Sequence, residues 1–187
     1  MKIVTFIGSS RNGGNSELLT DIALKDITHK KIYLKDLDIR PIEDLRHTKD
    51  GFQVIKDDYD NVIEELQNSD IVIFATPIYW YSMSGIMKNM VDRFSQSIRD
   101  NRFPDLKERL KKIRTIVVIV GGDKPRIKGL PLIQQFQYTF EFLEMSLWSY
   151  IIGEANKPGE IMDDKYALSQ AALLNENIKS LLYKEGE

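Results

Sequence analysis

A glycine- and serine-rich segment near the N-terminus carries residue types that could bind an anion. It runs from Gly8 to Ser16, reads GSSRNGGNS, and lies between an apolar run and a helical pattern. The start of a helix offers unpaired N–H groups and a partial positive charge, which suit a phosphate. The hydroxyls of Ser9 and Ser16, the side chain of Asn15 and the guanidinium of Arg11 could add donors. The segment therefore predicts a phosphate site.

Two better-known phosphate loops do not match this segment. A nucleoside-triphosphate loop needs lysine after its second conserved glycine, where this chain has Gly14 followed by Asn15. A dinucleotide fingerprint needs glycine at the position of Ser10. A site for a terminal phosphate monoester remains. The alternative is an ordinary loop in which Asn15 caps the helix and Arg11 is a solvated surface charge.

A second loop, after the apolar run Ile71 to Ala75, carries three consecutive aromatic residues. Its residues are Pro77, Ile78, Tyr79, Trp80, Tyr81 and Ser82. Aromatic rings just past a buried strand make a plausible wall for a flat, aromatic ligand, whose polar rim backbone groups could contact. The alternative is that some of these rings cover the end of the sheet or contact a second subunit.

A third loop consists of Gly121, Gly122 and Asp123, directly after another apolar run. Two glycines at the end of a strand indicate that backbone approaches something closely, although a tight turn explains them almost as well. This loop is a candidate for ligand binding only because it is expected to lie beside the other two loops.

The elements that must position these loops alternate between strand and helix. We expect strands at 2–7, 31–34, 71–75, 114–120 and 147–152, and helices at 15–26, 57–67, from 84 onward, 130–144 and 163–183. An irregular stretch is expected at 35–56 and a charged connector at 99–112. This alternation predicts an α/β fold with a doubly wound parallel sheet of order 2-1-3-4-5 in a three-layer sandwich. Ligands bind such sheets beyond the carboxyl ends of strands one and three, where all three loops are expected.

Length and composition limit the function classes. The 187 residues predict a single domain spanning 1–187. The formal net charge of −2 gives no sign of nucleic-acid or anionic-membrane binding. The chain contains no cysteine, which excludes disulfides, thiolate catalysis and cysteine-ligated clusters. No segment approaches the length of a membrane span, so we expect a cytoplasmic protein.

Other polar residues have simpler interpretations. His29 and His47 have no identifiable partner and are expected to be solvated. Asp57, Asp58 and Asp60 are typical of a helix N-terminus, where their charge is favourable, more than of a metal site. We therefore predict no metal ligands and no side-chain acid–base pair.

With these loops in place, the chain resembles the flavodoxin-like NAD(P)H-dependent FMN oxidoreductases over nearly its whole length. The matching motifs are G-S-x-R…G-N-S at Gly8–Ser16, T-P-x-Y-W at Thr76–Trp80, M-S-G-x-M-K-N-x-x-D-R at Met83–Arg93, the glycine turn at Gly121 and the pattern at Pro158-Gly159-Glu160. The branch that it resembles includes the iron–sulfur flavoproteins. Those carry a cysteine cluster where this chain has Pro41 to Lys56, so the cluster is absent here.

The resemblance implies bound FMN, with NADPH or NADH as donor and a quinone, flavin or other small electrophile as acceptor. It implies that Ser9, Arg11, Asn15 and Ser16 hold the FMN phosphate. It also implies that the residues from Pro77 to Trp80 and from Gly121 to Asp123 line the isoalloxazine. Family members are commonly homodimers or homotetramers, and the helix after Gly85 and the exposed aromatics are the candidate interface.

Two other functions stay open. A flavodoxin-type carrier would pass single electrons between proteins, but such carriers tend to be much more acidic than a chain of net charge −2. The other is a non-catalytic flavin or nucleotide sensor.

Overall fold

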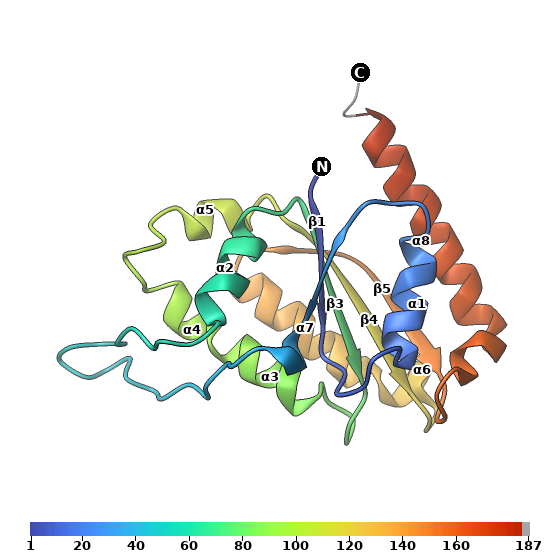
Figure 1. Ribbon diagram of the computed structural model, residues 1–187, viewed down its shortest axis with the longest axis horizontal. Helices are drawn as coiled ribbons and strands as arrows, with labels where there is room; N and C mark the ends of the chain where they lie inside the picture. The colour runs from blue at the N-terminus through green and yellow to red at the C-terminus, as the bar shows by residue number, and fades with distance from the viewer. Residues whose placement is uncertain (185–187) are drawn as a thin grey trace.

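The computed structural model describes residues 1–184 and contains a five-stranded parallel sheet of order β2-β1-β3-β4-β5 (Figure 1). The strands are β1 Ile3–Ile7, β2 Lys30–Tyr33, β3 Ile71–Pro77, β4 Arg114–Gly121 and β5 Ser146–Glu154. The α-helices are α1 Asn15–Ala23, α2 Tyr59–Gln67, α3 Gly85–Asp92, α4 Phe94–Ser97, α5 Leu106–Leu110, α6 Pro125–Lys128, α7 Leu130–Phe142 and α8 Lys165–Lys184. Two 3₁₀ turns are η1 Leu34–Asp36 and η2 Glu160–Asp163. The predicted doubly wound sheet and its strand order are confirmed.

The three central strands are apolar because helices cover both of their faces. Every residue of β1 is buried, as are the residues of β3 before Pro77. Such continuous runs are typical of parallel strands between two helical layers. Strand β3 continues two residues beyond the expected end, because Pro77 pairs with Val120 as the last position of the ladder. A proline has no backbone N–H to donate to the ladder, and the end of the strand is a position where that loss is tolerated.

Two apolar cores lie on opposite faces of the sheet. One core packs α2, α3, α5 and α7 against residues such as Phe6 and Phe74. The other core packs α1 and α8 against residues such as Ile7 and Ile73. Figure 1 shows α1 and α8 together on one side and α2 to α5 on the other. The sheet therefore holds its strand ends, and the loops that follow them, between two rigid layers.

Helix ends differ from the sequence-based expectation by a few residues. Helix α1 ends at Ala23, three residues early, and Asp26 has a left-handed φ of 63° in the turn that follows. Helix α2 begins at Tyr59, two residues late, and the Asp57 carboxylate just before the helix accepts a hydrogen bond from the Tyr59 amide. The stretch predicted to be irregular, 35–56, contains no element beyond η1. No helix within residues 1–184 combines the length and apolarity needed to cross a bilayer.

A fully buried ion pair anchors the irregular stretch to α3. The side chains of Arg93 and Asp57 have no exposed surface, and Arg93 Nη1 lies 2.6 Å from Asp57 Oδ2. The same guanidinium donates to the Arg40 carbonyl at 2.9 Å and to Gln96 Oε1 at 2.8 Å, and lies 4.4 Å from the centre of the Tyr59 ring. Of the three aspartates expected to favour a helix N-terminus by their charge, Asp57 instead forms the buried ion pair with Arg93.

The environment of Asp57 couples this pair to pH. Burial alone would raise the pKa of the Asp57 carboxyl, but hydrogen bonds from Arg93 and from the Arg40 and Tyr59 amides outweigh it and lower the pKa. Because the folded pKa lies below the unfolded value of about 4, the carboxylate stabilises the fold above that pH. The contribution is lost as the pH falls through the folded pKa.

Replacing Arg93 by methionine should lower the free energy of unfolding by about 3–5 kcal/mol, because it leaves the buried Asp57 charge without its partner. Urea unfolding followed by circular dichroism measures this. The matched control is Arg102→Met, which removes partly exposed ion pairs with Asp60 and Asp100 and should cost at most about 1 kcal/mol. Equal losses in the two variants would contradict the anchoring role of Arg93.

Candidate functional site

The loops after β1 and β3 are held together by the side chain of Ser84. Its hydroxyl donates to the Gly8 carbonyl at 2.6 Å and accepts from the Met87 amide at 3.1 Å, so it caps α3 and ties it to the end of β1. The Ser84 amide donates to Thr76 Oγ1 at 3.1 Å. A Cβ at Gly8 would lie 2.9 Å from Met87 Cβ, so only glycine allows this approach. The start of α3 near Ser84 is confirmed.

A cleft of about 170 Å³ opens between these loops and the ends of β4 and β5. Its lining comes from four segments that are far apart in sequence. They are Ser9 and Arg11–Ser16, Pro77–Tyr79, Val120–Gly122, and Ala155, Asn156 and Pro158. The structure thus brings the three predicted loops to one cleft at the carboxyl edge of the sheet, where strand order reverses.

The end of the cleft at the start of α1 has the properties of an anion site. Gly14 is the N-cap and makes no side-chain cap bond, so the first-turn amides are free to point outward. A Cβ at Gly14 would lie 2.7 Å from Ser9 Oγ, so a side chain at this position would clash with Ser9 and displace it. Ser16 is buried, and its hydroxyl has no hydrogen-bond partner within residues 1–184. A phosphate oxygen would give these donors an acceptor.

A buried carboxylate shapes the same loop. Glu17 accepts a hydrogen bond from the Gly13 amide at 2.8 Å, which holds that glycine at its left-handed φ of 62°. It also accepts from Tyr33 at 2.6 Å and from Lys31 at 3.2 Å. Burial alone would raise the pKa of Glu17, but these hydrogen bonds and the charge of Lys31 lower it. Lys31 offsets the negative charge that Glu17 would otherwise present to an anion.

Asn15 has a different partner from the one considered in the sequence. Gly14, not Asn15, occupies the N-cap position. The Asn15 side chain donates to the Lys157 carbonyl at 2.8 Å and accepts from the Gly159 amide at 2.9 Å. It therefore joins the loop after β1 to the loop after β5, and its backbone N–H is the donor left for an anion. Arg11 is exposed, and its guanidinium has no ion-pair partner in the described chain.

A second recess of about 420 Å³ adjoins the cleft. The two share Ile78, Gly121, Gly122 and Asn156 as walls. The glycines permit close approach, since a Cβ at Gly121 would lie 3.0 Å from the Ile78 side chain. The cleft therefore has its polar end at α1, and the adjoining recess has its aromatic end at Trp80 and Tyr81.

An ion pair and a phenol border the aromatic end of this recess. Asp123 Oδ2 accepts from Lys128 at 2.5 Å and from the Tyr81 hydroxyl at 2.9 Å. The hydrogen bonds from Lys128 and Tyr81 lower the pKa of Asp123, so the carboxylate is charged at neutral pH. This contact fixes the aromatic loop against the third predicted loop.

The aromatic loop is a strained two-residue turn. Tyr79 and Ser82 form an antiparallel bridge, with backbone hydrogen bonds of 2.9 and 3.0 Å. Between them Trp80 and Tyr81 have φ of 49° and 63°, the geometry of a type I′ turn. Glycine and asparagine are favoured there, and bulky residues are genuine outliers. Trp80 is nevertheless 94% exposed, so no intramolecular packing of its ring offsets the strain. Strain of this kind concentrates at functional sites.

Most of the predicted site residues line this space. Ser9, Arg11, Gly14, Asn15, Ser16, Pro77, Ile78, Tyr79, Gly121 and Gly122 line the cleft, and Trp80 and Asp123 line the recess. Ser82 lines neither, and its hydroxyl donates to Gln135 at 2.9 Å. The cleft residues that the sequence reasoning missed are chiefly Ala155 and Asn156, while Pro158 was noted only as part of a family motif. They follow β5 at the same edge of the sheet as the three predicted loops, and this position after a strand could have identified them as cleft residues.

A family model of NADPH-dependent FMN reductases matches residues 1–145, which is more than half of the chain and includes the first three loops of the cleft. The chain belongs to this family. It is accordingly an FMN-dependent NAD(P)H oxidoreductase, as the motifs in its sequence predicted.

Two curated relatives support this assignment over most of their length. YwqN of Bacillus subtilis (strain 168), named as an NAD(P)H-dependent FMN-containing oxidoreductase, is 49% identical over 174 residues, covering 93% of this chain and 96% of YwqN. An iron–sulfur flavoprotein of Archaeoglobus fulgidus is 29% identical over 168 residues, covering 88% of this chain and 75% of that protein.

Solved structures show the same fold. A Bacillus subtilis protein described as Trp repressor binding protein has a TM-score of 0.75 and 42% identity, covering 92% of this chain and 97% of that one. An FMN-dependent NADH-azoreductase from Bacillus anthracis, in complex with FMN, has a TM-score of 0.64, covering 95% of this chain and 98% of that one. At 12% identity the azoreductase supports the fold alone.

Replacing Trp80 by glycine should raise the free energy of unfolding by about 1–2 kcal/mol, because it removes the cost of a left-handed bulky residue. If the strained turn serves to place the Trp80 ring beside the reactants, the same variant should turn over more slowly or change its preference among acceptors. Urea unfolding and steady-state kinetics measure the two effects.

The matched control is Asp26→Gly, which relieves a left-handed residue far from the cleft. It should gain stability, by less than Trp80→Gly because aspartate tolerates this region better, and should keep normal kinetics. A Trp80→Gly enzyme with unchanged kinetics would make the exposed ring irrelevant to the reaction.

Proposed function

We propose that the cleft holds FMN with its phosphate at the start of α1 and its ring in the recess between the aromatic turn and Gly121–Asp123. The observation that carries this is that the cleft at the anion end and the recess at the aromatic end adjoin, with four wall residues in common. The buried Ser16 hydroxyl without a partner and the glycine cradle at Gly14 fit a phosphate. The side chains of Ile78 and Asn156 pack directly on Gly121 and Gly122, so these four residues would form the wall against which a flat ring lies.

In this proposal the chain binds, orients and shields, and the cofactor supplies the redox chemistry. Bound FMN would supply two-electron hydride chemistry between reduced nicotinamide and a small acceptor such as a quinone, a flavin or another electrophile. The first-turn amides, Ser16 and Arg11 would fix the phosphate, and Pro77–Tyr79 would set the plane of the ring. The Tyr81–Asp123–Lys128 contact would hold the aromatic turn over the recess.

One-electron transfer between proteins is the second candidate. Docking to a redox partner favours a strongly acidic rim, whereas this recess is bordered by Lys128 beside Asp123. The mixed charge favours small reactants over a protein partner. We further propose that the chain is one domain and acts as a homodimer or homotetramer.

Arg11→Ala should weaken FMN binding by about 1–3 kcal/mol, since it removes a charge-assisted hydrogen bond to the phosphate. Its affinity for riboflavin, which lacks the phosphate, should be unchanged. Fluorescence titration of the apoprotein with the two flavins measures both affinities. Lys25→Ala, an exposed cation outside the cleft, is the control and should bind FMN normally. Equal losses for FMN and riboflavin would contradict the phosphate contact.

The holoenzyme should be yellow, and anaerobic NADPH or NADH should bleach the flavin rapidly. Potentiometric titration should then show a single two-electron step, as expected for an enzyme that accepts hydride. Two resolved one-electron steps would favour the carrier. Slow bleaching by both nucleotides would favour a sensor, and a protein that takes up no FMN would refute the proposed site.

A further inference from the structure

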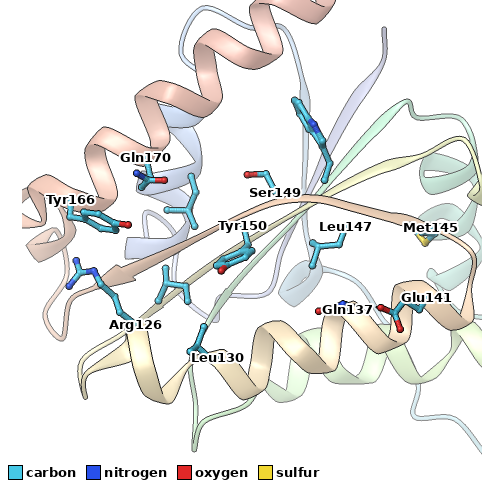
Figure 2. Close-up of a pocket in the computed structure, with 13 residues that line it drawn as sticks. Arg126, Leu130, Gln137, Glu141, Met145, Leu147, Ser149, Tyr150, Tyr166 and Gln170 are labelled. Carbon is cyan, nitrogen blue, oxygen red and sulfur yellow. Dashed lines mark hydrogen bonds between the residues drawn. The ribbon is translucent and has the colours of Figure 1, made fainter.

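The two edge strands of the sheet differ in what lies beside them. The outer edge of β5 borders an open cavity of about 700 Å³ between α7 and α8 (Figure 2). The opposite edge strand, β2, instead sends side chains toward the start of α1. Lys31 and Tyr33 are two residues apart, so they lie on the same face of the strand, and both donate to Glu17. Neither lines the cleft or the recess, so β2 is connected to the phosphate loop through Glu17.

Glu17 occupies the third position of α1, where a glutamate commonly completes a capping box. In that motif the carboxylate accepts a hydrogen bond from the amide of the N-cap residue, whose own side chain caps the helix. Here the N-cap is Gly14, which has no such side chain, and Glu17 accepts from the Gly13 amide, one residue earlier, at 2.8 Å. The first intrahelical bond runs from the Leu18 amide to the Gly14 carbonyl at 2.9 Å. The carboxylate therefore holds the loop, while the amides before Leu18 are left for an anion.

The hydrogen bond to Glu17 constrains a residue that packing does not hold. Gly13 has a left-handed φ of 62°, and no atom of the described chain lies within 4 Å of the position that its Cβ would take. Glycine loses more conformational freedom on ordering than any other residue. Gly13 also lines the cleft, beside Gly14. The contact with Glu17 thus orders this part of the loop before a ligand arrives, which lowers the entropic cost of binding.

The same carboxylate places a negative charge at the helix end that would bind a phosphate. Like charges at one site repel each other, and Glu17 is only 4% exposed, so salt screens its charge weakly. Lys31 is the neighbouring cation, but it divides its contacts between Glu17 at 3.2 Å and Asp21 at 2.6 Å. One cation that faces two carboxylates leaves a net negative charge behind the phosphate loop.

We propose that Glu17 is a positioning residue that sets how tightly the chain retains FMN, through two opposed effects. Its hydrogen bond to Gly13 shapes the phosphate loop and favours binding. Its charge opposes the phosphate and limits the affinity, and Lys31 restores part of it. This inference rests on the proposed binding of the FMN phosphate at the start of α1. It adds β2, through Lys31 and Tyr33, to the elements that control the site.

Glu17→Gln tests the effect of the charge. The glutamine carbonyl can still accept the hydrogen bond from Gly13, but the negative charge is gone. The affinity for FMN should rise about fivefold, the effect of removing one like charge in a water-like medium. The affinity for riboflavin, which lacks the phosphate, should be unchanged. Fluorescence titration of the full-length apoprotein with the two flavins measures both.

Glu17→Leu tests the positioning effect, because it removes the hydrogen bond as well as the charge. It should bind FMN about tenfold more weakly than Glu17→Gln, the loss expected for one hydrogen bond. In the FMN-free protein the Gly13 amide should exchange its hydrogen slowly in the wild type and in Glu17→Gln, and rapidly in Glu17→Leu. Hydrogen exchange followed by NMR measures this protection.

Lys31→Met should act in the direction opposite to Glu17→Gln. Its affinity for FMN should fall about fivefold, because the charge of Glu17 is then unopposed, and its affinity for riboflavin should stay the same. The control is Glu64→Gln, which removes an exposed carboxylate on α2, outside the cleft, and should bind both flavins normally. Thermal unfolding followed by circular dichroism shows whether each variant is folded.

Three results would overturn the inference even though FMN still binds through its phosphate. An affinity of Glu17→Gln for FMN at or below the wild-type value would reject the opposing charge. Equal affinities of the glutamine and leucine variants would reject the positioning effect, and an unchanged affinity of Lys31→Met would separate β2 from the site. A wild type that binds FMN and riboflavin equally well would instead refute the phosphate site itself, and this inference with it.

Discussion

The serine at the start of α3 is the contact on which the geometry of the site depends. Its hydroxyl joins the carbonyl at the end of β1 to the first turn of α3, and its amide reaches the threonine near the end of β3. Parallel strands alone bring loops to one edge of a sheet, but they do not set the distance between those loops. Ser84 does so, and Gly8 makes the approach sterically possible. The same buried side chain therefore positions both the end of the cleft at α1 and the aromatic recess beside it.

Two further features near Ser84, a strained turn and a buried ion pair, lie in separate places. The strained turn of Trp80 and Tyr81 lies at the rim, where it presents a ring to solvent. The buried pair of Arg93 and Asp57 lies behind α3 and holds the long segment that follows η1. Here hydrogen bonds and one ion pair fasten this part of the chain.

Sequence patterns revealed the fold and the loops because their signals are local. An apolar run such as 71–75 and the glycine-rich segment from Gly8 define a strand end and a helix start without knowledge of the rest of the chain. The contacts that connect distant segments left no such signal. Asn15 meets a loop 144 residues away, and Arg93 meets Asp57 across 36 residues. The left-handed geometry of Trp80 was also hidden, because the turn residues that normally announce it are absent.

The lining of the cleft has a consequence for proton chemistry. Its anion end consists of backbone amides and hydroxyls, together with an arginine, a residue that keeps its charge at any pH proteins tolerate. The carboxylate behind it, Glu17, has a lowered pKa and stays ionised near neutrality. Neither of the chain's two histidines lines the cleft or the recess. The charges of the residues that line the cleft therefore stay constant around neutral pH. A change in reaction rate in this pH range would then reflect ionisation of the reactants and not of the protein.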